Sequence, residues 1–560
     1  MKKQLCIIAT LCLLGNITHS QTWQWAKSAH GAFDDWGSSI AVDTWGNTFV
    51  AGRFTSVSVS FGTTTLTNTD TTNTGNTGMS VDIFLTKYDA SGNFLWAKSV
   101  RGTDNMDERV FSVAIDASGN AYMAGMYSSP TLSFDSITLT NAGVENIFLA
   151  KYDANGNVIW AKSYGGSYHD WAYYVAVDVS GNIYMTGVFQ SPTINFDTIT
   201  LTNLDNTGNY TDMFLVKFDV NGNVVWAKSA GGTNYEWALA VSVDALGNAY
   251  QTGYFYSPTL ALGSTTLTNN GFSDIFLTKY DINGNVVWAR STGSDNDDNA
   301  NSIVVGTSGD IYIAGNFNSH TIAFGTTTLT NAGTCNIFIA KYDTNGTALW
   351  AKSAGGTETD LGYSVAVDPT GDAFITGAFF SPAITFDSIT LNNSGFANIF
   401  LAKYNSVGNL LWAKSEGGTD NDGALSVAVD VSGNASITGW FRDVCSFGST
   451  TLVNVDPVFG GSDLFIAKLD NTTGIDRLGN KLKILICPNP ASDIFTVNCT
   501  YANIEDVEIN IYNNFGKLVK SEMLTQNNAQ INIGDFSNGV YIVAIKLKDL
   551  TEYQKLFIER

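Results

Sequence analysis

The sequence predicts an all-β protein in which a seven-bladed β-propeller, closed by its N-terminal strand, precedes a small Ig-like β-sandwich. A unit of 62 to 71 residues recurs through most of the chain, and each copy holds four short apolar segments separated by Gly/Asn/Asp turns. These segments are apolar on both faces, so each small sheet must be covered on both sides. Sheets that pack against two neighbours around a closed ring meet that requirement.

The first 20 residues predict a secretory signal peptide. Lys2 and Lys3 precede the apolar run "LCIIATLCLLG", and Ser20 supplies a small residue before the expected cleavage site. The run is too short to span a bilayer, and no later segment reaches eighteen apolar residues. We therefore expect a mature chain that begins at Gln21 and has no transmembrane segment.

Residues 21–470 are predicted to form the propeller. Each copy reads "WAKS", a Gly-rich stretch, "SVAVD", a turn, "IYMTGVF", a longer excursion and "DIFLAKYD". The first "WAKS" (Trp25–Ser28) has no "IFLAKYD" before it, and the last "DLFIAKLD" (Asp463–Asp470) has no "WAKS" after it. Pairing these two half-repeats completes the seventh blade and removes the exposed edges that an open ring would leave.

The repeats resemble the SBBP family of bacterial β-propeller repeats, whose hallmark is an Asp, a short apolar strand, a second Asp, a turn and "GNxYxTG". The stretch "DWAYYVAVDVSGNIYMTG" (Asp170–Gly187) shows this pattern well. One copy departs from it, since Gly306 stands where the other repeats have Asp. The resemblance implies no reaction, but it does imply an exported, S-layer-like cell-surface protein.

After a polar linker at 471–480, residues 481–560 alternate apolar and polar positions as short strands do, which predicts the β-sandwich. This region resembles the type A C-terminal sorting domain of proteins exported by type IX secretion. The matching residues are Pro488, Asn489, Pro490, Gly516, Lys517, Gly539, Val540, Tyr541 and Lys555. The resemblance implies the type IX machinery as a partner, export across the outer membrane and a surface-attached or extracellular destination. The alternative is an ordinary Ig-like binding module.

One acidic residue precedes the innermost strand of each predicted blade: Asp35, Glu108, Asp170, Glu236, Asp298, Asp360 and Asp422. A ring of carboxylates suits Ca²⁺ as a ligand set. The structural alternative is that each carboxylate accepts backbone N–H groups in a tight turn. Presence in every blade favours the structural role, and no acidic run has the order of an EF-hand loop, so no cofactor is expected beyond possible Ca²⁺.

The basic residue two positions after each repeated Trp presents a similar choice. These residues are Lys27, Lys98, Lys162, Lys228, Arg290, Lys352 and Lys414. They could form an anion-binding stripe, but lysines that lie along an outer strand are the favoured interpretation. The Trp side chains are likewise assigned to the packing between blades in preference to a sugar-stacking platform.

The order of strands places the Asp-x-x-Gly-Asn turns on one face of the disc and the Gly-rich linkers and long excursions on the other. Several excursions, such as "TLSFDSITLT", read as small hairpins. We expect the second face to vary between blades and to carry any binding site.

The net charge of −22 disfavours nucleic acid as a partner. No nucleophile elbow, Walker loop or metal-protease helix is present, and the mature chain keeps only His30, His169 and His320, at unrelated repeat positions. Cys335, Cys445, Cys487 and Cys499 are expected to be mostly free and buried. The favoured function is non-catalytic binding of an extracellular glycan or protein, in adhesion or in a surface layer. The alternative is a secreted carbohydrate-active propeller enzyme.

Overall fold

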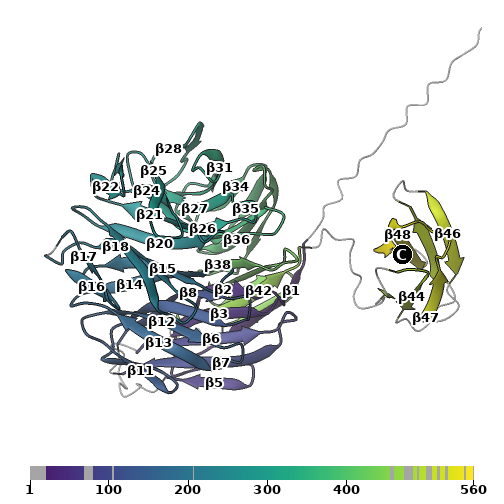
Figure 1. Cartoon of the computed structure of the whole chain (residues 1–560), viewed down its shortest axis with the longest axis horizontal. Coiled ribbons are helices and arrows are strands. Elements are labelled where there is room, and N and C mark those ends of the chain that lie inside the picture. The colour runs from purple at the N-terminus through teal and green to yellow at the C-terminus, as the bar shows by residue number, and fades with distance from the viewer. Residues whose placement is uncertain are drawn as a thin grey trace, which may run out of the picture. The chain divides into compact units, whose positions relative to one another are not determined.

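The computed structural model describes residues 21–68, 80–103, 106–205, 207–454 and 460–471 of the repeat region. Beyond that region it describes 484–487, 491–499, 507–513, 517–523, 528–547 and 550–558. The predicted signal peptide, most of the predicted linker, Pro488–Pro490 and Gly516 lie outside these residues. One compact unit comprises Gln21–Thr472, and a second lies within Thr473–Arg560 (Figure 1).

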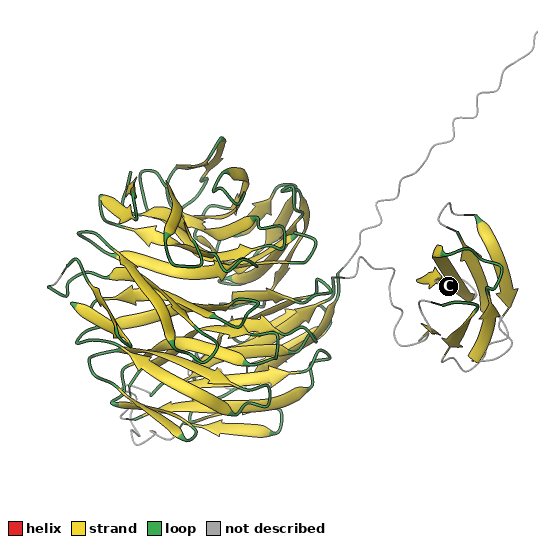
Figure 2. Cartoon of the chain, viewed as in Figure 1, coloured by secondary structure: helices red, strands yellow, loops and turns green. Residues whose placement is uncertain are grey.

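The described residues contain strands and no helix (Figure 2). Consequently none of them belongs to a helix that could cross a membrane. In the first unit the described residues form five four-stranded antiparallel sheets and two six-stranded ones, besides two-stranded hairpins, and each of these seven sheets contains one group of four strands in the same order.

The four strands of a group follow one another from the innermost to the outermost. The innermost strands are β2 (Asp35–Val42), β8 (Glu108–Ile115), β14 (Asp170–Val177), β20 (Glu236–Val243), β26 (Asp298–Val305), β32 (Asp360–Val367) and β38 (Gly423–Val429). The second strands are β3 (Thr48–Phe54), β9 (Ala121–Tyr127), β15 (Ile183–Phe189), β21 (Ala249–Phe255), β27 (Ile311–Phe317), β33 (Ala373–Phe379) and β39 (Ala435–Phe441). The third strands are β6 (Asp82–Tyr88), β12 (Asn146–Tyr152), β18 (Asp212–Phe218), β24 (Asp274–Tyr280), β30 (Asn336–Tyr342), β36 (Asn398–Tyr404) and β42 (Asp463–Leu469). The outermost strands are β7 (Phe94–Gly102), β13 (Val158–Tyr164), β19 (Val224–Ala230), β25 (Val286–Thr292), β31 (Ala348–Gly355), β37 (Leu410–Glu416) and β1 (Trp23–Ala29).

The innermost strands form a closed ring. Each contacts the innermost strand of the next group, and β38 contacts β2. Serine side chains bridge several of these junctions: Val175 N–H donates to Ser112 Oγ (3.1 Å), and Ile40 N–H donates to Ser426 Oγ (3.2 Å) where the last group meets the first. This is the arrangement of a repeat β-propeller.

The predicted pairing of the two half-repeats is present. Strand β1 pairs antiparallel with β42, with Trp25 opposite Lys468 and Ala29 opposite Leu464. The sheet that results has the order β1-β42-β39-β38, so the N-terminal strand is the outermost strand of the last group. Strands far apart in the sequence therefore close the ring.

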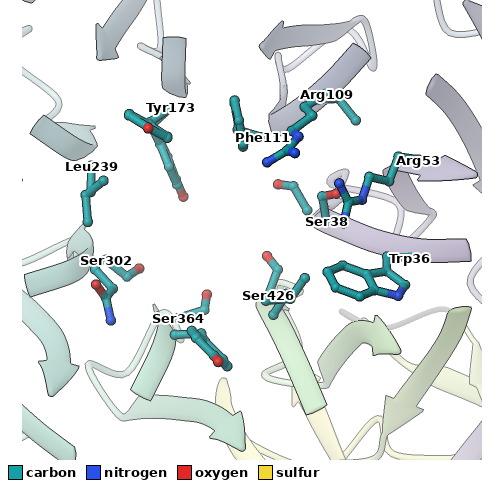
Figure 3. A pocket seen from close by; sticks show the side chains of 16 residues that line it. Trp36, Ser38, Arg53, Arg109, Phe111, Tyr173, Leu239, Ser302, Ser364 and Ser426 are labelled. Atoms are coloured by element: carbon teal, nitrogen blue, oxygen red, sulfur yellow. The ribbon is translucent and has the colours of Figure 1, made fainter. Parts of the chain in front are cut away.

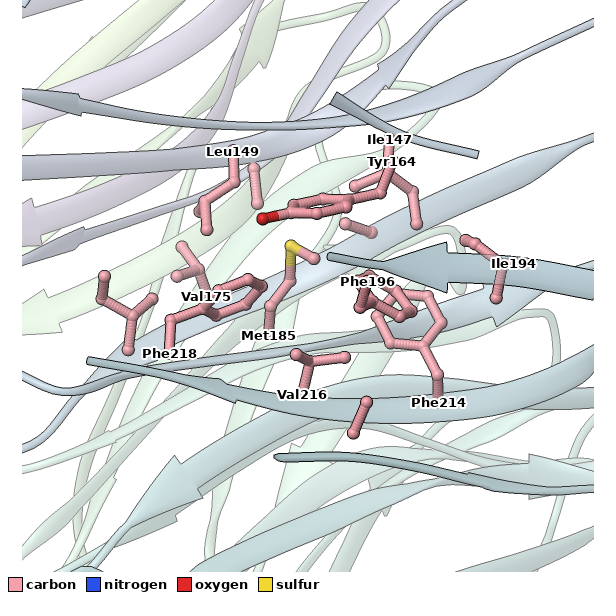
Figure 4. Packing of buried hydrophobic residues seen from close by; sticks show 14 of the residues in the cluster. Ile147, Leu149, Tyr164, Val175, Met185, Ile194, Phe196, Phe214, Val216 and Phe218 are labelled. Atoms are coloured by element: carbon pink, nitrogen blue, oxygen red, sulfur yellow. The ribbon is translucent and has the colours of Figure 1, made fainter. Parts of the chain in front are cut away.

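Apolar side chains fill the space between adjacent groups. Figure 4 shows Ile147 and Leu149 of one group packed over Met185 and Phe218 of the next, and all four are buried. Eight clusters of this kind occur among the described residues of the repeat region, because each sheet presents apolar side chains on both faces. Burial of side chains of this size stabilises the fold by about 1.5–3 kcal/mol each.

The repeated Trp contacts the turn of the following group. Trp25 Nε1–H donates to the carbonyl of Ala90 (3.3 Å), and its ring lies against Gly92, whose φ is 80°. A Cβ at Gly92 would lie 2.6 Å from Trp25 Cδ2, so both the positive φ and the close approach require glycine. The same indole hydrogen bond recurs at Trp96, Trp226, Trp288 and Trp350. These contacts fit the predicted packing role.

The repeat that has Gly306 in place of Asp carries a compensating carboxylate. In other repeats a buried Lys of the third strand pairs with the Asp at that position, as Lys403 Nζ does with Asp368 (3.0 Å) and Lys468 Nζ with Asp430 (3.0 Å). Lys341 instead pairs with Asp310 (2.8 Å), four residues beyond Gly306. A cation this deeply buried requires a partner, and the turn supplies one from another position.

The excursions form two-stranded hairpins, as predicted. They are β4 (Ser58–Phe61) with β5 (Thr64–Thr67), β10 (Thr131–Phe134) with β11 (Ile137–Thr140), β16 (Thr193–Phe196) with β17 (Ile199–Thr202), β22 (Thr259–Leu262) with β23 (Thr265–Thr268), β28 (Thr321–Phe324) with β29 (Thr327–Thr330), β34 (Ala383–Phe386) with β35 (Ile389–Asn392), and β40 (Val444–Phe447) with β41 (Thr450–Val453). Each hairpin packs on an outermost strand, and β10 and β34 form hydrogen bonds with the outermost strands β7 and β31 of the preceding groups. They therefore cover strand edges that would otherwise be exposed.

The C-terminal unit consists of two sheets that share one buried core. The first contains β43 (Ile484–Cys487), β44 (Ile494–Cys499) and β47 (Asn528–Asn532). The second contains β45 (Val507–Tyr512), β46 (Leu518–Met523), β48 (Gly539–Leu547) and β49 (Leu550–Ile558). Phe495 and Ile531 of the first sheet and Ile509 and Val543 of the second belong to the same cluster, and all four are buried.

Candidate functional site: the central channel

A cavity of about 470 Å³ lies on the inside of the ring (Figure 3). Every innermost strand contributes to its wall, and one residue comes from a second strand, Arg53 of β3. The lining residues are Trp36, Ser38, Ser39, Arg53, Arg109, Val110, Phe111, Tyr173, Tyr174, Leu239, Asn301, Ser302, Tyr363, Ser364, Leu425 and Ser426. The volume lies within the range of small-molecule sites. None of the lining residues belongs to a hairpin.

A β-bulge in each innermost strand directs side chains into this cavity. In β14 the pairing with β15 shifts between Ala172 and Tyr174, which leaves Tyr173 as the extra residue. A bulge re-aims a side chain locally, and Tyr173 indeed points into the channel (Figure 3). The equivalent extra residues are Ser38, Phe111, Leu239, Asn301, Tyr363 and Leu425, each at a corresponding shift.

These seven positions carry five kinds of side chain, with Tyr and Leu each present twice. Two residues earlier the variation is similar, with Trp36, Arg109, Trp171, Trp237, Asn299, Leu361 and Gly423 in equivalent places. Within each of these two sets, the seven positions are structurally equivalent. Packing alone would therefore be satisfied by the same residue type in all seven repeats. Variation at the wall of a cavity is what a ligand without sevenfold symmetry requires.

Two arginines lie on one side of the channel. The Arg53 guanidinium lies over the Trp36 ring, 4.4 Å from its centroid. Arg109 pairs with Asp107, through Nε at 2.7 Å and Nη2 at 2.5 Å. Burial and the neighbouring Arg109 lower the pKa of Arg53 from its usual value. Both guanidinium groups therefore lie at this part of the wall, that of Arg109 in an ion pair and that of Arg53 over an indole ring.

Aromatic side chains continue the wall on the next two groups. Phe111 and Tyr173 have ring centroids 5.0 Å apart, and Tyr173 lies 5.7 Å from Trp237. Trp237 in turn stacks on Tyr254, with centroids 6.1 Å apart and planes 13° apart. Rings held in this way by their neighbours present fixed faces to a ligand.

The predicted acid ring lies at the start of the innermost strands, and all seven carboxylates are buried. Asp170 accepts hydrogen bonds from Ser191 Oγ (2.8 Å), from Ser191 N–H (3.2 Å) and from Gly166 N–H (2.7 Å). The serine 21 residues after the acid plays the same part for Asp35, Glu108, Asp298 and Asp360. Among the described residues no group of three or more metal-ligating side chains is present. The hydrogen bonds from backbone N–H groups to these carboxylates are the ones that the structural alternative requires.

Burial of the ring acids predicts a stability that depends on pH. Desolvation, with a smaller contribution from the nearby Asp212, raises the pKa of Glu236 to about 8, from an ordinary value of 4.5. Between these two values the folded protein holds a proton that the unfolded chain has released, so the free energy of unfolding falls as pH rises. We expect Glu236→Gln to make this decline shallower between pH 4.5 and pH 8, as measured by denaturant unfolding across that range.

Glu358→Gln is the matched control, because this side chain is exposed and should leave the pH dependence unchanged. An equal slope for Glu236→Gln and the unsubstituted protein would contradict the assignment. If the acids are structural, calcium and EDTA should also leave the melting temperature unchanged.

The basic residues after the repeated Trp lie on the outermost strands. Lys98, Lys162 and Lys352 pair with the hairpin-turn residues Asp135, Asp197 and Asp387, at 3.6, 3.9 and 3.2 Å. All three pairs are partly exposed, and such pairs contribute about 0–1 kcal/mol. Three of the seven basic residues thus contact acids of the hairpin turns.

Of the predicted sorting residues, Lys517, Gly539, Val540 and Tyr541 are described in full. Tyr541 is buried, and its hydroxyl donates to the Ser537 carbonyl (3.0 Å). Lys517 is exposed, and its backbone N–H donates to Asn513 Oδ1 (3.0 Å). Lys555 lies in β49, opposite Ile542. Cys335 and Cys445 are free and buried, as predicted.

The channel residues were not among the predicted site residues. The predicted site residues of the repeat region are the acids that recur in every repeat. In the structure these residues are buried and hold neighbouring segments of a repeat together. The usable signal was the opposite one, namely the positions one and three residues after each ring acid, where otherwise similar repeats differ.

Residues 485–559 match the family model of the secretion system C-terminal sorting domain. This match indicates that the protein is secreted through the type IX secretion system, to the cell surface or the extracellular space, and that residues in this region interact with that machinery. The chain is therefore an exported repeat β-propeller with a C-terminal sorting domain.

Two curated relatives match part of the chain. An uncharacterized WD repeat-containing protein of Acanthamoeba polyphaga mimivirus is 28% identical over 480 residues, which cover 69% of this chain and 34% of the relative. The regulatory protein FlaEY of Caulobacter vibrioides is 23% identical over 290 residues, which cover 47% of this chain and 29% of the relative. The chain thus spans about a third of the length of the curated relatives it matches. The first relative agrees with a repeat β-propeller.

Among solved structures, Sqt1 from Chaetomium thermophilum is similar over 78% of this chain and 99% of its own, at 10% identity and a TM-score of 0.36. Similarity at this level carries no argument about function.

Proposed function

We propose that the protein is a surface-attached, non-catalytic propeller with seven blades of the SBBP type, and that it binds an extracellular glycan in its central channel. A role in adhesion or in a surface layer follows from that activity and from export. The C-terminal unit acts as an Ig-like sandwich that directs secretion, joined to residues 21–470 through a linker at 471–480.

The observation that carries the proposal is the wall of the cavity. The seven equivalent bulge positions hold five kinds of side chain, among them Phe111, Tyr173, Asn301 and Leu425. Aromatic faces suit the C–H surface of a sugar ring, and serine and asparagine groups around them suit its hydroxyls. Pockets that combine apolar walls with a few convergent polar groups are the usual form of a ligand site.

The enzyme alternative requires an acid pair at a pocket. The cavity-lining residues include no carboxylate, and the ring acids are buried and hydrogen-bonded. Assays for polysaccharide turnover by the purified protein test this alternative. Formation of product would show that the protein is an enzyme and would contradict the proposed non-catalytic function.

The experiment that tests the proposal is a saccharide array probed with the mature full-length chain. We expect retention of a defined subset of glycans, unaffected by EDTA. Absence of binding to every glycan would contradict the proposed function.

A further inference from the structure

Among the described residues, no carboxylate lies within ion-pair distance of one cation in the channel, although Asp107 and Asp34 act on its charge from further away. The Arg53 guanidinium forms no hydrogen bond and no ion pair with any residue that the structure describes, and its side chain is half-buried. Its only close polar or aromatic contact there is the face of Trp36. Five N–H donors in a partly desolvated position therefore lack acceptors.

The other arginine of the channel, Arg109, has an ion-pair partner. Arg109 is held by Asp107 through two nitrogens, which fixes its orientation and neutralises its charge. The two guanidinium groups lie on the same side of the channel, close to Phe111 and Trp36 (Figure 3). Of the two, Arg53 is thus the one without a directly paired carboxylate among the described residues.

A guanidinium stacked on an aromatic ring leaves its N–H edge for a ligand. That edge matches the two oxygens of a carboxylate, which it binds in a bidentate manner. The attraction is stronger in a partly desolvated cavity than in water. The arrangement therefore selects a planar anion over a neutral group.

The other residues of the cavity wall indicate which chemical groups the rest of the ligand carries. Tyr173 and Tyr363 present aromatic rings, and Ser302, Ser364 and Asn301 present hydroxyl and amide groups. The net charge of −22 on the chain disfavours the approach of a densely charged polymer. A hydroxyl-rich ligand with an isolated carboxylate satisfies both conditions.

We propose that the central channel recognises an acidic saccharide, with the carboxylate of a hexuronic acid bound by Arg53 and the sugar ring packed among the channel aromatics. This inference rests on the proposed function, because it names the class of glycan that the same cavity takes.

The test compares hexuronic-acid disaccharides with hexose disaccharides of the same linkage, by titration calorimetry on the full-length mature chain. The two probes differ only in a carboxylate replacing a hydroxymethyl group. We expect the acidic probe to bind about tenfold tighter or more, since hydrogen bonds to charged groups contribute about 1.5–3 kcal/mol. Arg53→Gln should abolish this preference, so that the two probes bind with equal affinity.

Arg101→Gln is the matched control, because Arg101 is exposed on the outermost strand β7 and should leave the preference intact. Arg53→Lys keeps the charge but lacks the bidentate edge, so it should retain only part of the preference. Melting temperatures of the variants show whether each remains folded.

Equal affinities for the two probes, or an acid preference that survives Arg53→Gln, would overturn this inference and leave the proposed function standing. Failure of both probes, together with an array on which no glycan is retained, would overturn the proposed function as well. Binding of a peptide through its free C-terminal carboxylate, lost on amidation, in place of the saccharide would also overturn the saccharide assignment.

Discussion

Removal of residues Thr22–Ser28 is expected to destabilise the repeat region severely. This deletion takes away most of β1, exposes the edge of β42 and leaves the last group with three strands. It also removes Trp25, which is buried against Tyr88 and the Gly92 turn. Loss of a core Trp alone costs about 3–5 kcal/mol, so the melting temperature should fall sharply in a thermal scan of the full-length protein.

Two point variants separate the contributions to this effect. Trp25→Ala should reproduce a large part of the loss, whereas Gln24→Ala, at an exposed position of the same strand, should leave stability nearly unchanged. A deletion variant that melts like the parent chain would show that β1 does not close the ring.

Truncation at Asn480 is expected to stop export at the periplasm. The strands of the repeat region end with β42 at Leu469, so the truncated chain retains every strand of the ring. It lacks residues 485–559, which match the sorting-domain family. Cell fractionation in a host with type IX secretion should find the truncated chain in the periplasm and the full chain at the surface or in the medium.

A signal-bearing reporter fused to residues 480–560 provides the reciprocal experiment. It should reach the surface in the secreting host and remain periplasmic in a secretion-deficient one. Surface delivery of the truncated chain in the secreting host would contradict the sorting role of the C-terminal unit.

The sequence was sufficient for the strand order and for the closure, for identifiable physical reasons. Strand segments with two apolar faces must be covered on both sides. Because the array of repeats begins with "WAKS" and ends with "DLFIAKLD", each of these two segments could complete a group only by pairing with the other. Short alternating segments such as "TLSFDSITLT" also predicted their hairpins. Their position was not predicted: the excursions were expected at a binding face, but they pack on the outermost strands.

One ion pair and the direction of the bulged side chains could not be predicted from the sequence pattern, because both depend on three-dimensional geometry. The pairing of Lys341 with Asp310 could not be read from the repeat, because the compensating carboxylate lies four residues from the position that lost it. The bulges that turn Phe111 and Tyr173 toward the channel shift the register by one residue. A one-residue shift exchanges the two faces of a strand, so alternation alone assigned these side chains no special place.

The most direct test of binding in the channel is to fill it. Ser38 occupies the bulge position where the next repeat has Phe111, so the fold accommodates a phenyl ring there. Ser118→Trp is the matched control, since Trp45 occupies the equivalent turn position of the first repeat and is exposed. The measurement is the saccharide array, probed with the parent chain and with both variants. Loss of glycan retention by Ser38→Phe, with retention unchanged for Ser118→Trp, is the result predicted; undiminished retention by a folded Ser38→Phe protein would contradict a ligand site in the channel.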